Sequence, residues 1–183
     1  MGLLSKKNKP SQKAYAVVTG AGSGIGRSFA LELTKRGGDV ICADIELSSA
    51  QETVDLIQSM TSSSAYAVHC DVGLKESVHA LVEQAEQLLG HPVTLLINNA
   101  GVGLGGKFDE VSLEDWQWCM HVNLWGVIHG CHYFVPKFKQ QGFGAIINVA
   151  SAAGYTAAPE MTAYNVTQSC VLALSQTFAS AIY

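Results

Sequence analysis

A glycine-rich stretch at residues 19–26, Thr-Gly-Ala-Gly-Ser-Gly-Ile-Gly, lies between an apolar run of strand length and an amphipathic segment. A strand, a glycine turn and a helix start together predict a phosphate-binding cradle, because glycines let the backbone approach a pyrophosphate and the free N–H groups of the helix face it. The general dinucleotide fingerprint G-x-G-x-x-G is not met, since Arg27 stands where its third glycine is expected. A plain tight turn therefore remains the alternative at this point.

Length and charge narrow the possible functions. The chain has 183 residues, 48% hydrophobic and 14% charged, which suffices for one well-buried core. A formal net charge of -4 and an isoelectric point near 5.8 argue against a nucleic-acid groove, and we expect no nucleic-acid partner. Residues 1–13 contain four lysines and are expected to form a flexible basic segment.

Targeting and redox signals are few. No apolar run approaches the roughly 20 residues that span a bilayer, and the start of the chain lacks the apolar middle of a signal peptide. The five cysteines are widely spaced, without a C-x-x-C pair, and are expected to be reduced and mostly buried. We therefore expect a cytoplasmic protein without a membrane span. His129 and His132 could form half of a metal site, but no further ligand joins them at suitable spacing, so no metal is expected.

Short apolar runs alternate with helix-period segments along the whole chain. This alternation predicts an α/β fold with a doubly wound parallel sheet of strand order 3-2-1-4-5, covered by helices on both faces. The expected strands are residues 14–19, 40–44, 65–70, 94–98 and 145–149. The expected helices are residues 24–36, 48–60, 75–89, 113–137 and 162–182.

Asp44 ends the second expected strand, about 20 residues beyond the glycine turn, where a ribose-binding acid is expected. Its carboxylate can accept both adenosine ribose hydroxyls and would repel a 2′-phosphate, and neither Ile45 nor Glu46 could neutralise one. NAD is therefore expected as the cofactor in preference to NADP. The alternative is a capping role for Asp44 at the next helix, although Ser48 or Ser49 could serve equally well there.

The sequence T-G-x-x-x-G-I-G resembles the short-chain dehydrogenase/reductase family, as do Asp71-Val72 and Asn98-Asn99-Ala100-Gly101 after two later strands. The resemblance implies a Rossmann-type, NAD(P)-binding domain over residues 14–183. It is expected to be incomplete at its C-terminus, because the family continues with two more strands and a substrate-covering region. The implied cofactor-binding residues are Gly20, Ser23, Gly24, Ile25, Gly26, Asp44, Asp71, Val72, Asn98, Ala100, Gly101, Tyr164 and Gln168.

The same resemblance implies three catalytic residues. Tyr164 would exchange a proton with the substrate oxygen, Ser151 would hydrogen-bond that oxygen, and Asn123 would anchor a water in the proton relay. Taken alone, Ser151 could be an ordinary strand-end turn and Asn123 a solvent-facing residue in mid-helix. In the family a lysine follows the tyrosine by four residues and favours its ionised form, but Gln168 stands at that position. A free tyrosine titrates near pH ~10, so the missing positive charge matters near neutrality.

Together these features predict an oxidoreductase that interconverts a secondary alcohol and a ketone by hydride transfer. The alternative is a non-catalytic nucleotide-binding or dimerising module, because Gln168 replaces the lysine and the substrate region is absent. Ser151 does not lie in G-x-S-x-G, so a hydrolase is not supported. The family also implies a homodimer or homotetramer formed through the fourth and fifth helices, and the last strand is expected to leave an unpaired edge.

Overall fold

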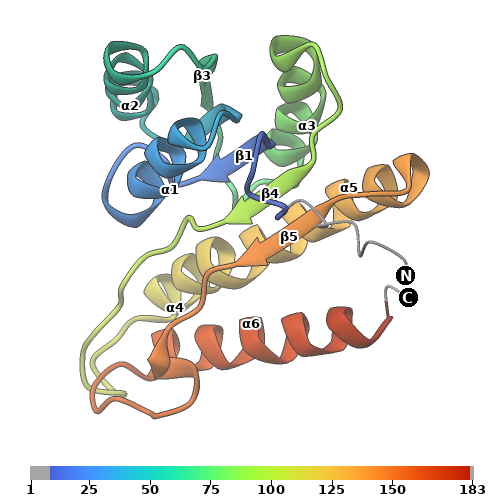
Figure 1. The fold of residues 1–183 in the computed structure, drawn as a ribbon. Helices are drawn as coiled ribbons and strands as arrows, with labels where there is room; N and C mark the ends of the chain where they lie inside the picture. The colour runs from blue at the N-terminus through green and yellow to red at the C-terminus, as the bar shows by residue number, and fades with distance from the viewer. Residues whose placement is uncertain (1–8, 182–183) are drawn as a thin grey trace, which may run out of the picture.

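The computed structural model describes residues 9–181 and contains one five-stranded sheet between helices (Figure 1). All four strand pairs are parallel, and the order is β3-β2-β1-β4-β5. Both the fold class and the strand order predicted from the sequence are thereby confirmed. The strands are β1 (Tyr15–Thr19), β2 (Asp39–Asp44), β3 (Ala65–His69), β4 (Leu95–Asn98) and β5 (Ala145–Asn148).

Within the described residues, six α-helices connect and follow the strands. Their bounds are α1 (Gly24–Lys35), α2 (Leu47–Met60), α3 (Lys75–Leu89), α4 (Leu113–Met120), α5 (Gly126–Gln141) and α6 (Thr162–Ala181). Local sequence sets several of these ends. Ser112 caps α4 by accepting a bond from the Asp115 N–H, at 3.0 Å, while α3 and α5 end at Gly90 and Gly142, whose φ angles are 65° and 76°.

Alternating strand residues build two cores on the two faces of the sheet. Val18 packs with side chains of α1 and α2, whereas the adjacent Val17 packs with α3 and with Phe134 of α5. This alternation follows from the two-residue repeat of a strand, and nearly continuous apolar strands are typical of a parallel sheet covered on both sides. Helix α6 packs against α5 through a smaller cluster centred on Val171.

The helix predicted over residues 113–137 is the largest departure from expectation. It is interrupted by a π-helical turn, η1 (His121–Trp125), and then continues as α5 to Gln141, past Pro136. Single π turns often occur where a side chain has a special role, and here Asn123 lies inside the turn. The other strand and helix ends within the described residues differ from the predictions by no more than one residue. The basic residues Lys6 and Lys7 and the predicted helix end at Ile182 lie outside the described residues.

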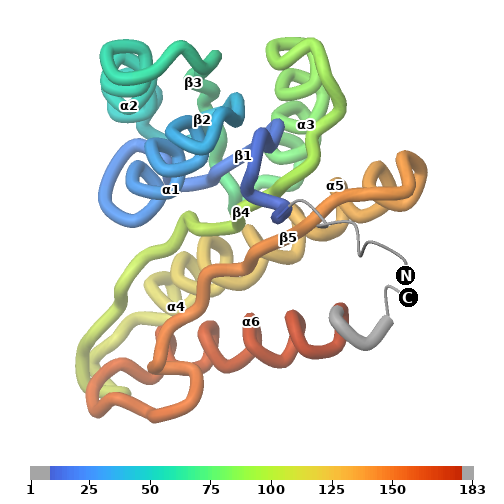
Figure 2. The backbone as a smooth tube through the Cα atoms, viewed as in Figure 1, coloured from blue at the N-terminus to red at the C-terminus, as the bar shows by residue number. Residues whose placement is uncertain are grey.

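Two long connections meet at one end of the molecule. The segment after β4 and the segment after β5 run side by side (Figure 2), and the Gly106 N–H donates to the Glu160 carbonyl at 2.7 Å. A short 3₁₀ turn, η2 (Ala152–Gly154), starts the second connection. In residues 9–181, no helix has the length and apolar character needed to cross a membrane.

Candidate active site

A groove of about 490 Å³ lies at the carboxyl ends of β1, β2, β3 and β4. In a doubly wound sheet this edge, next to the point where the strand order reverses, is where ligands bind. Ten of the residues expected to bind cofactor line it: Gly20, Ser23, Gly24, Ile25, Gly26, Asp44, Asp71, Val72, Ala100 and Gly101. The glycine turn and the ends of the neighbouring strands are thus brought into one cavity.

Two glycines of the turn are fixed by close backbone approach. A Cβ on Gly26 would lie 2.0 Å from the Gly20 carbonyl oxygen, and a Cβ on Gly20 would lie 2.8 Å from the Ala100 Cα. Gly20 also has φ +64°, a left-handed conformation that favours glycine. The N-cap of α1 is Ser23, whose side chain makes no capping bond. The first turn of α1 therefore presents backbone N–H groups to the groove, which suits a pyrophosphate.

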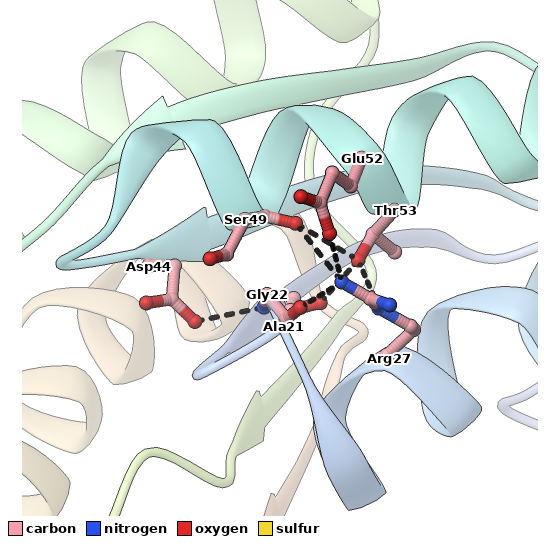
Figure 3. Close-up of polar contacts among 7 residues, drawn as sticks. All are labelled: Ala21, Gly22, Arg27, Asp44, Ser49, Glu52 and Thr53. Atoms are coloured by element: carbon pink, nitrogen blue, oxygen red, sulfur yellow. Dashed lines mark hydrogen bonds and ion pairs between the residues drawn. The ribbon is translucent and has the colours of Figure 1, made fainter.

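Asp44 closes the other end of the cradle (Figure 3). Its Oδ2 accepts the Gly22 N–H at 2.7 Å, and its Oδ1 accepts the Glu46 N–H at 3.0 Å. Each carboxylate oxygen has a second lone pair, so both remain able to accept a ribose hydroxyl. Asp44 is thus a fixed, negatively charged acceptor at the groove wall. It does not cap α2, because the N-cap residue of α2 is Glu46, whose side chain makes no capping bond.

The last residue of β4, Asn98, and the residue after it, Asn99, point to different places. Asn98 is buried and donates to Asn148 Oδ1 at 2.8 Å, and Asn148 in turn donates to Ser175 at 3.0 Å, so Asn98 joins β4 to β5 and is absent from the groove lining. Asn99 does line the groove, and its amide donates to the Thr19 carbonyl at 2.9 Å. Asn98 was expected to bind the cofactor, whereas Asn99, which lines the groove, was not among the expected residues. Because adjacent residues of a strand face opposite sides, the alternation could have separated them.

Asn123 is buried, at 2% exposure, so the solvent-facing alternative is wrong. Its side-chain amide pairs with the backbone of Val102: Oδ1 accepts the Val102 N–H at 2.7 Å, and Nδ2 donates to the Val102 carbonyl at 2.9 Å. Nδ2 also lies 3.3 Å from the Thr167 hydroxyl of α6. The π turn therefore places one amide between the segment after β4, which lines the groove, and α6.

Ser151 and Gln168 are joined by a direct hydrogen bond. The Ser151 N–H donates to Gln168 Oε1 at 2.8 Å, while the Ser151 hydroxyl accepts the Ala153 N–H at 3.1 Å and caps η2. Gln168 is 6% exposed and lies one helical turn after the half-buried Tyr164. Its bond ties the segment after β5 to the helix that carries Tyr164. A lysine at position 168 has no acceptor atom and could not make this bond.

The thiols are free and largely buried, as predicted from their spacing, and only Cys170 is half-buried. Cys70 lies in the groove lining, where burial raises the pKa of its thiol to about 11. It therefore stays protonated at neutral pH and contributes a small apolar surface rather than a nucleophile. Throughout residues 9–181, no three His, Cys, Asp or Glu side chains gather closely enough to hold a metal ion.

Six lining residues are not among those expected to bind cofactor: Ile45, Cys70, Asn99, Val102, Trp118 and Val122. Val102 comes from the segment after β4, whereas Trp118 and Val122 come from α4 and η1. Their place depends on how α4 and η1 pack beside that segment, and no local motif records this packing.

Comparison with known proteins agrees with this arrangement. A family model described as short chain dehydrogenase matches residues 14–183. A cyclohexanol dehydrogenase from an Acinetobacter species is 38% identical over 94% of this chain and 68% of its own length. An uncharacterized oxidoreductase from Thermotoga maritima is 35% identical over 92% of this chain, which spans 65% of that relative.

Solved structures give the same result. A short chain dehydrogenase/reductase from Burkholderia phymatum, crystallised in complex with NAD, superposes with a TM-score of 0.88 at 37% identity and covers 93% of this chain. A putative short-chain alcohol dehydrogenase from Sinorhizobium meliloti superposes with a TM-score of 0.87 at 28% identity. This chain spans 60% and 65% of those two chains. On its sequence, strand order and groove, the chain belongs to the short-chain dehydrogenase/reductase family of oxidoreductases.

Proposed function

We propose that the groove binds NAD(H) and that the protein interconverts a secondary alcohol and a ketone. The observation that carries the proposal is the glycine cradle with Asp44 at its end: backbone N–H groups suit the pyrophosphate, and a fixed carboxylate suits the adenosine ribose. The related Burkholderia protein was crystallised with NAD, and the Acinetobacter relative is a cyclohexanol dehydrogenase, which agrees with this class of reaction.

The residues proposed to hold the cofactor fall into four groups. Gly20, Ser23, Gly24, Ile25 and Gly26 would contact the pyrophosphate, Asp44 the adenosine ribose, and Asp71 and Val72 the adenine, while Ala100 and Gly101 would leave room along the channel. The hydride of the reaction is supplied or accepted by the bound nicotinamide. NAD is proposed over NADP because the Asp44 carboxylate would repel a 2′-phosphate.

Proton transfer is assigned to Tyr164 and Ser151. During alcohol oxidation the substrate O–H proton passes to the Tyr164 phenolate oxygen as the carbon loses its hydride, and the Ser151 hydroxyl donates a hydrogen bond to the same oxygen. Asn123 is proposed to support this site by holding the Val102 backbone. Gln168 can hold a ribose hydroxyl through its amide N–H groups, but it supplies no positive charge.

A second candidate, nucleotide binding without turnover, is favoured by the state of Gln168. Its carbonyl oxygen is already used by the Ser151 N–H, at 2.8 Å, and the residue carries no charge that would favour tyrosinate. Such a protein would bind NADH in the same groove and leave alcohols unchanged. Turnover assays with a range of secondary alcohols distinguish the two candidates, because both predict cofactor binding.

The proposed assembly is a homodimer or homotetramer formed through the fourth and fifth predicted helices, which in the structure are α4 with α5, and α6. Leu113, Trp118 and Trp125 of this region are 74%, 47% and 46% exposed. Exposed aromatic and aliphatic side chains of this size are typical of a surface that a partner covers.

Fluorescence titration with NADH and NADPH tests the cofactor proposal. NADH should bind more tightly than NADPH. Asp44→Ala should reduce this difference in affinity, mainly by weakening the binding of NADH. Glu46→Ala is the matched control, because it removes a neighbouring carboxylate that is absent from the groove lining. Equal affinities for the two cofactors in the unmodified protein would contradict the proposal.

A further inference from the structure

Arg27 occupies the position where the general dinucleotide fingerprint has glycine, and its side chain is bound to both the turn and α2 (Figure 3). Its Nη2 donates to the Gly22 carbonyl and lies 3.0 Å from Glu52 Oε2. Its Nε donates to the Thr53 hydroxyl at 2.9 Å. The Arg27 side chain is 28% exposed, whereas Thr53 is completely buried.

The Thr53 hydroxyl has one hydrogen, and the Arg27 contact determines where it goes. Because Arg27 Nε is a donor only, the hydroxyl oxygen must accept from it and point its own hydrogen elsewhere. The Ala21 carbonyl lies 2.8 Å away, closer than the Ser49 carbonyl at 3.3 Å. The hydroxyl therefore donates to Ala21.

The Ala21 carbonyl and the Gly22 N–H belong to one peptide group. The carbonyl accepts the Thr53 hydroxyl, and the N–H donates to Asp44 Oδ2 at 2.7 Å. Hydrogen bonds in such a chain polarise one another, so each bond strengthens the next. A continuous relay thus runs from the Arg27 guanidinium through Thr53 and this peptide to the Asp44 carboxylate.

We propose that Arg27 and Thr53 are positioning residues for the adenosine half of the cofactor. They hold the Ala21–Gly22 peptide in the orientation that fixes Asp44, and Arg27 also holds the next carbonyl, that of Gly22. Neither residue is among those that line the groove, so both act through the peptide and Asp44. This inference rests on the proposed binding of NAD(H) in that groove.

Thr53→Val is the sharpest substitution, because valine keeps the shape of threonine and removes the hydroxyl. Thr53→Ser keeps the hydroxyl and is the conservative rescue. Arg27→Ala removes the start of the relay. Arg36→Ala is its matched control. Arg36, at the C-terminal end of α1, also forms an ion pair, 2.8 Å from Glu32, but it makes no contact with the glycine turn.

Three ligands separate the adenosine half from the rest of the cofactor: NADH, ADP-ribose and reduced nicotinamide mononucleotide. Thr53→Val and Arg27→Ala should each lower the affinity for NADH and for ADP-ribose by about 3- to 10-fold, which corresponds to the loss of one ordinary hydrogen bond. The mononucleotide, which lacks the adenosine ribose, should bind unchanged. Thr53→Ser and Arg36→Ala should bind all three ligands like the unmodified protein.

Two further readouts separate positioning from general damage. In an Asp44→Ala background, Thr53→Val should cause no additional loss of NADH affinity, because the end of the relay is already missing. Without any ligand, Thr53→Val should accelerate hydrogen exchange of the Gly22 amide, while Thr53→Ser should not.

Distinct outcomes overturn the two proposals. The relay would be overturned if the variants lost affinity for the mononucleotide as much as for ADP-ribose. It would also be overturned if Thr53→Val weakened NADH binding just as much in the Asp44→Ala background, or if Thr53→Val left the hydrogen exchange rate of the Gly22 amide unchanged. Failure of the unmodified protein to bind NADH would overturn the proposed function, and Gly22 exchange in the free protein would still decide whether the relay exists.

Discussion

Replacing Gln168 by lysine is expected to have two opposite effects. The substitution restores the charge that the family places beside its tyrosine, but it removes the acceptor of the Ser151 N–H, now bonded at 2.8 Å. A buried donor left without a partner costs about 1–3 kcal/mol, and Gln168 is 6% exposed, so little water can replace the amide oxygen. At about 3 °C per kcal/mol for a chain of this size, the melting temperature should fall by roughly 3–9 °C.

Gln168→Met is the matched control for stability. Methionine is of similar volume and unbranched, and it offers the Ser151 N–H only a weak sulfur acceptor. Both variants should therefore lower the melting temperature, as measured by thermal unfolding followed by circular dichroism. A Gln168→Met protein as stable as the parent would refute the assigned contribution of the Ser151 bond.

Activity should separate the same two variants. Gln168→Lys should raise alcohol oxidation with NAD near neutral pH, whereas Gln168→Met should not, because only lysine adds a positive charge. The gain should shrink at alkaline pH, since tyrosine ionises without help as the pH nears its ordinary pKa of about 10. Tyr164→Phe in the lysine background should abolish the gain. If Gln168→Lys binds NADH and remains inactive with all secondary alcohols tried, nucleotide binding without turnover is the better description.

Three other predictions follow from packing and titration. Gly26→Ala should destabilise the protein and abolish NADH binding, because its Cβ would clash with the Gly20 carbonyl. In the control Gly103→Ala, no atom would lie within 4 Å of the new Cβ, so this variant should unfold at the same temperature as the unmodified protein. Burial raises the pKa of the Cys42 thiol to about 12 and that of the Cys70 thiol to about 11. The free energy of unfolding should therefore be constant below pH 9 and should fall above pH 9 by about 1.4 kcal/mol per pH unit for each thiol. In urea unfolding, Cys70→Ala should make this fall less steep. Ile147, 43% exposed on the unpaired edge strand β5, should promote concentration-dependent association in sedimentation, and Ile147→Lys should reduce it.

Sequence patterns were sufficient for the sheet and most of the groove. Runs of Val, Ile and Ala predicted all five strands, and right-handed connections then left the observed order as the expected one. The glycine turn and Asp44 also meet as predicted, because both sit at the carboxyl ends of adjacent parallel strands. These features depend on short-range periodicity and on general rules of connection.

Long-range contacts explain what the sequence did not reveal. The π turn at Asn123 depends on the backbone of Val102, 21 residues earlier, and the helical period around it is otherwise unbroken. Likewise, the partner of Gln168 is a backbone group 17 residues earlier. Arg27 was noted only as a missing glycine, and its contacts with Thr53 depend on how α1 packs beside α2. None of these pairings leaves a local signature.

Three side chains also hold the backbone of a segment that follows a strand. The family resemblance assigns each of them a ligand-binding or catalytic role. Asp44 holds Gly22 after β1, Asn123 holds Val102 after β4, and Gln168 holds Ser151 after β5. Each anchor accepts a backbone N–H through a side-chain oxygen at 2.7 or 2.8 Å. The loops that would surround a bound nucleotide are thus already held before it arrives, which lowers the entropy that binding must offset.

This double use determines how substitutions at the three positions must be interpreted. Loss of activity in Asp44→Ala combines loss of a ligand contact with release of a loop, and in Asn123→Ala it combines loss of the proton relay with release of a loop. In each variant both effects act in the same direction. At Gln168 the two effects of a lysine oppose each other, because the loop is released while the charge is gained. Position 168 is therefore where stability and turnover should move in opposite directions, and a parallel fall of both would mean that the Ser151 anchor matters more to this site than the charge.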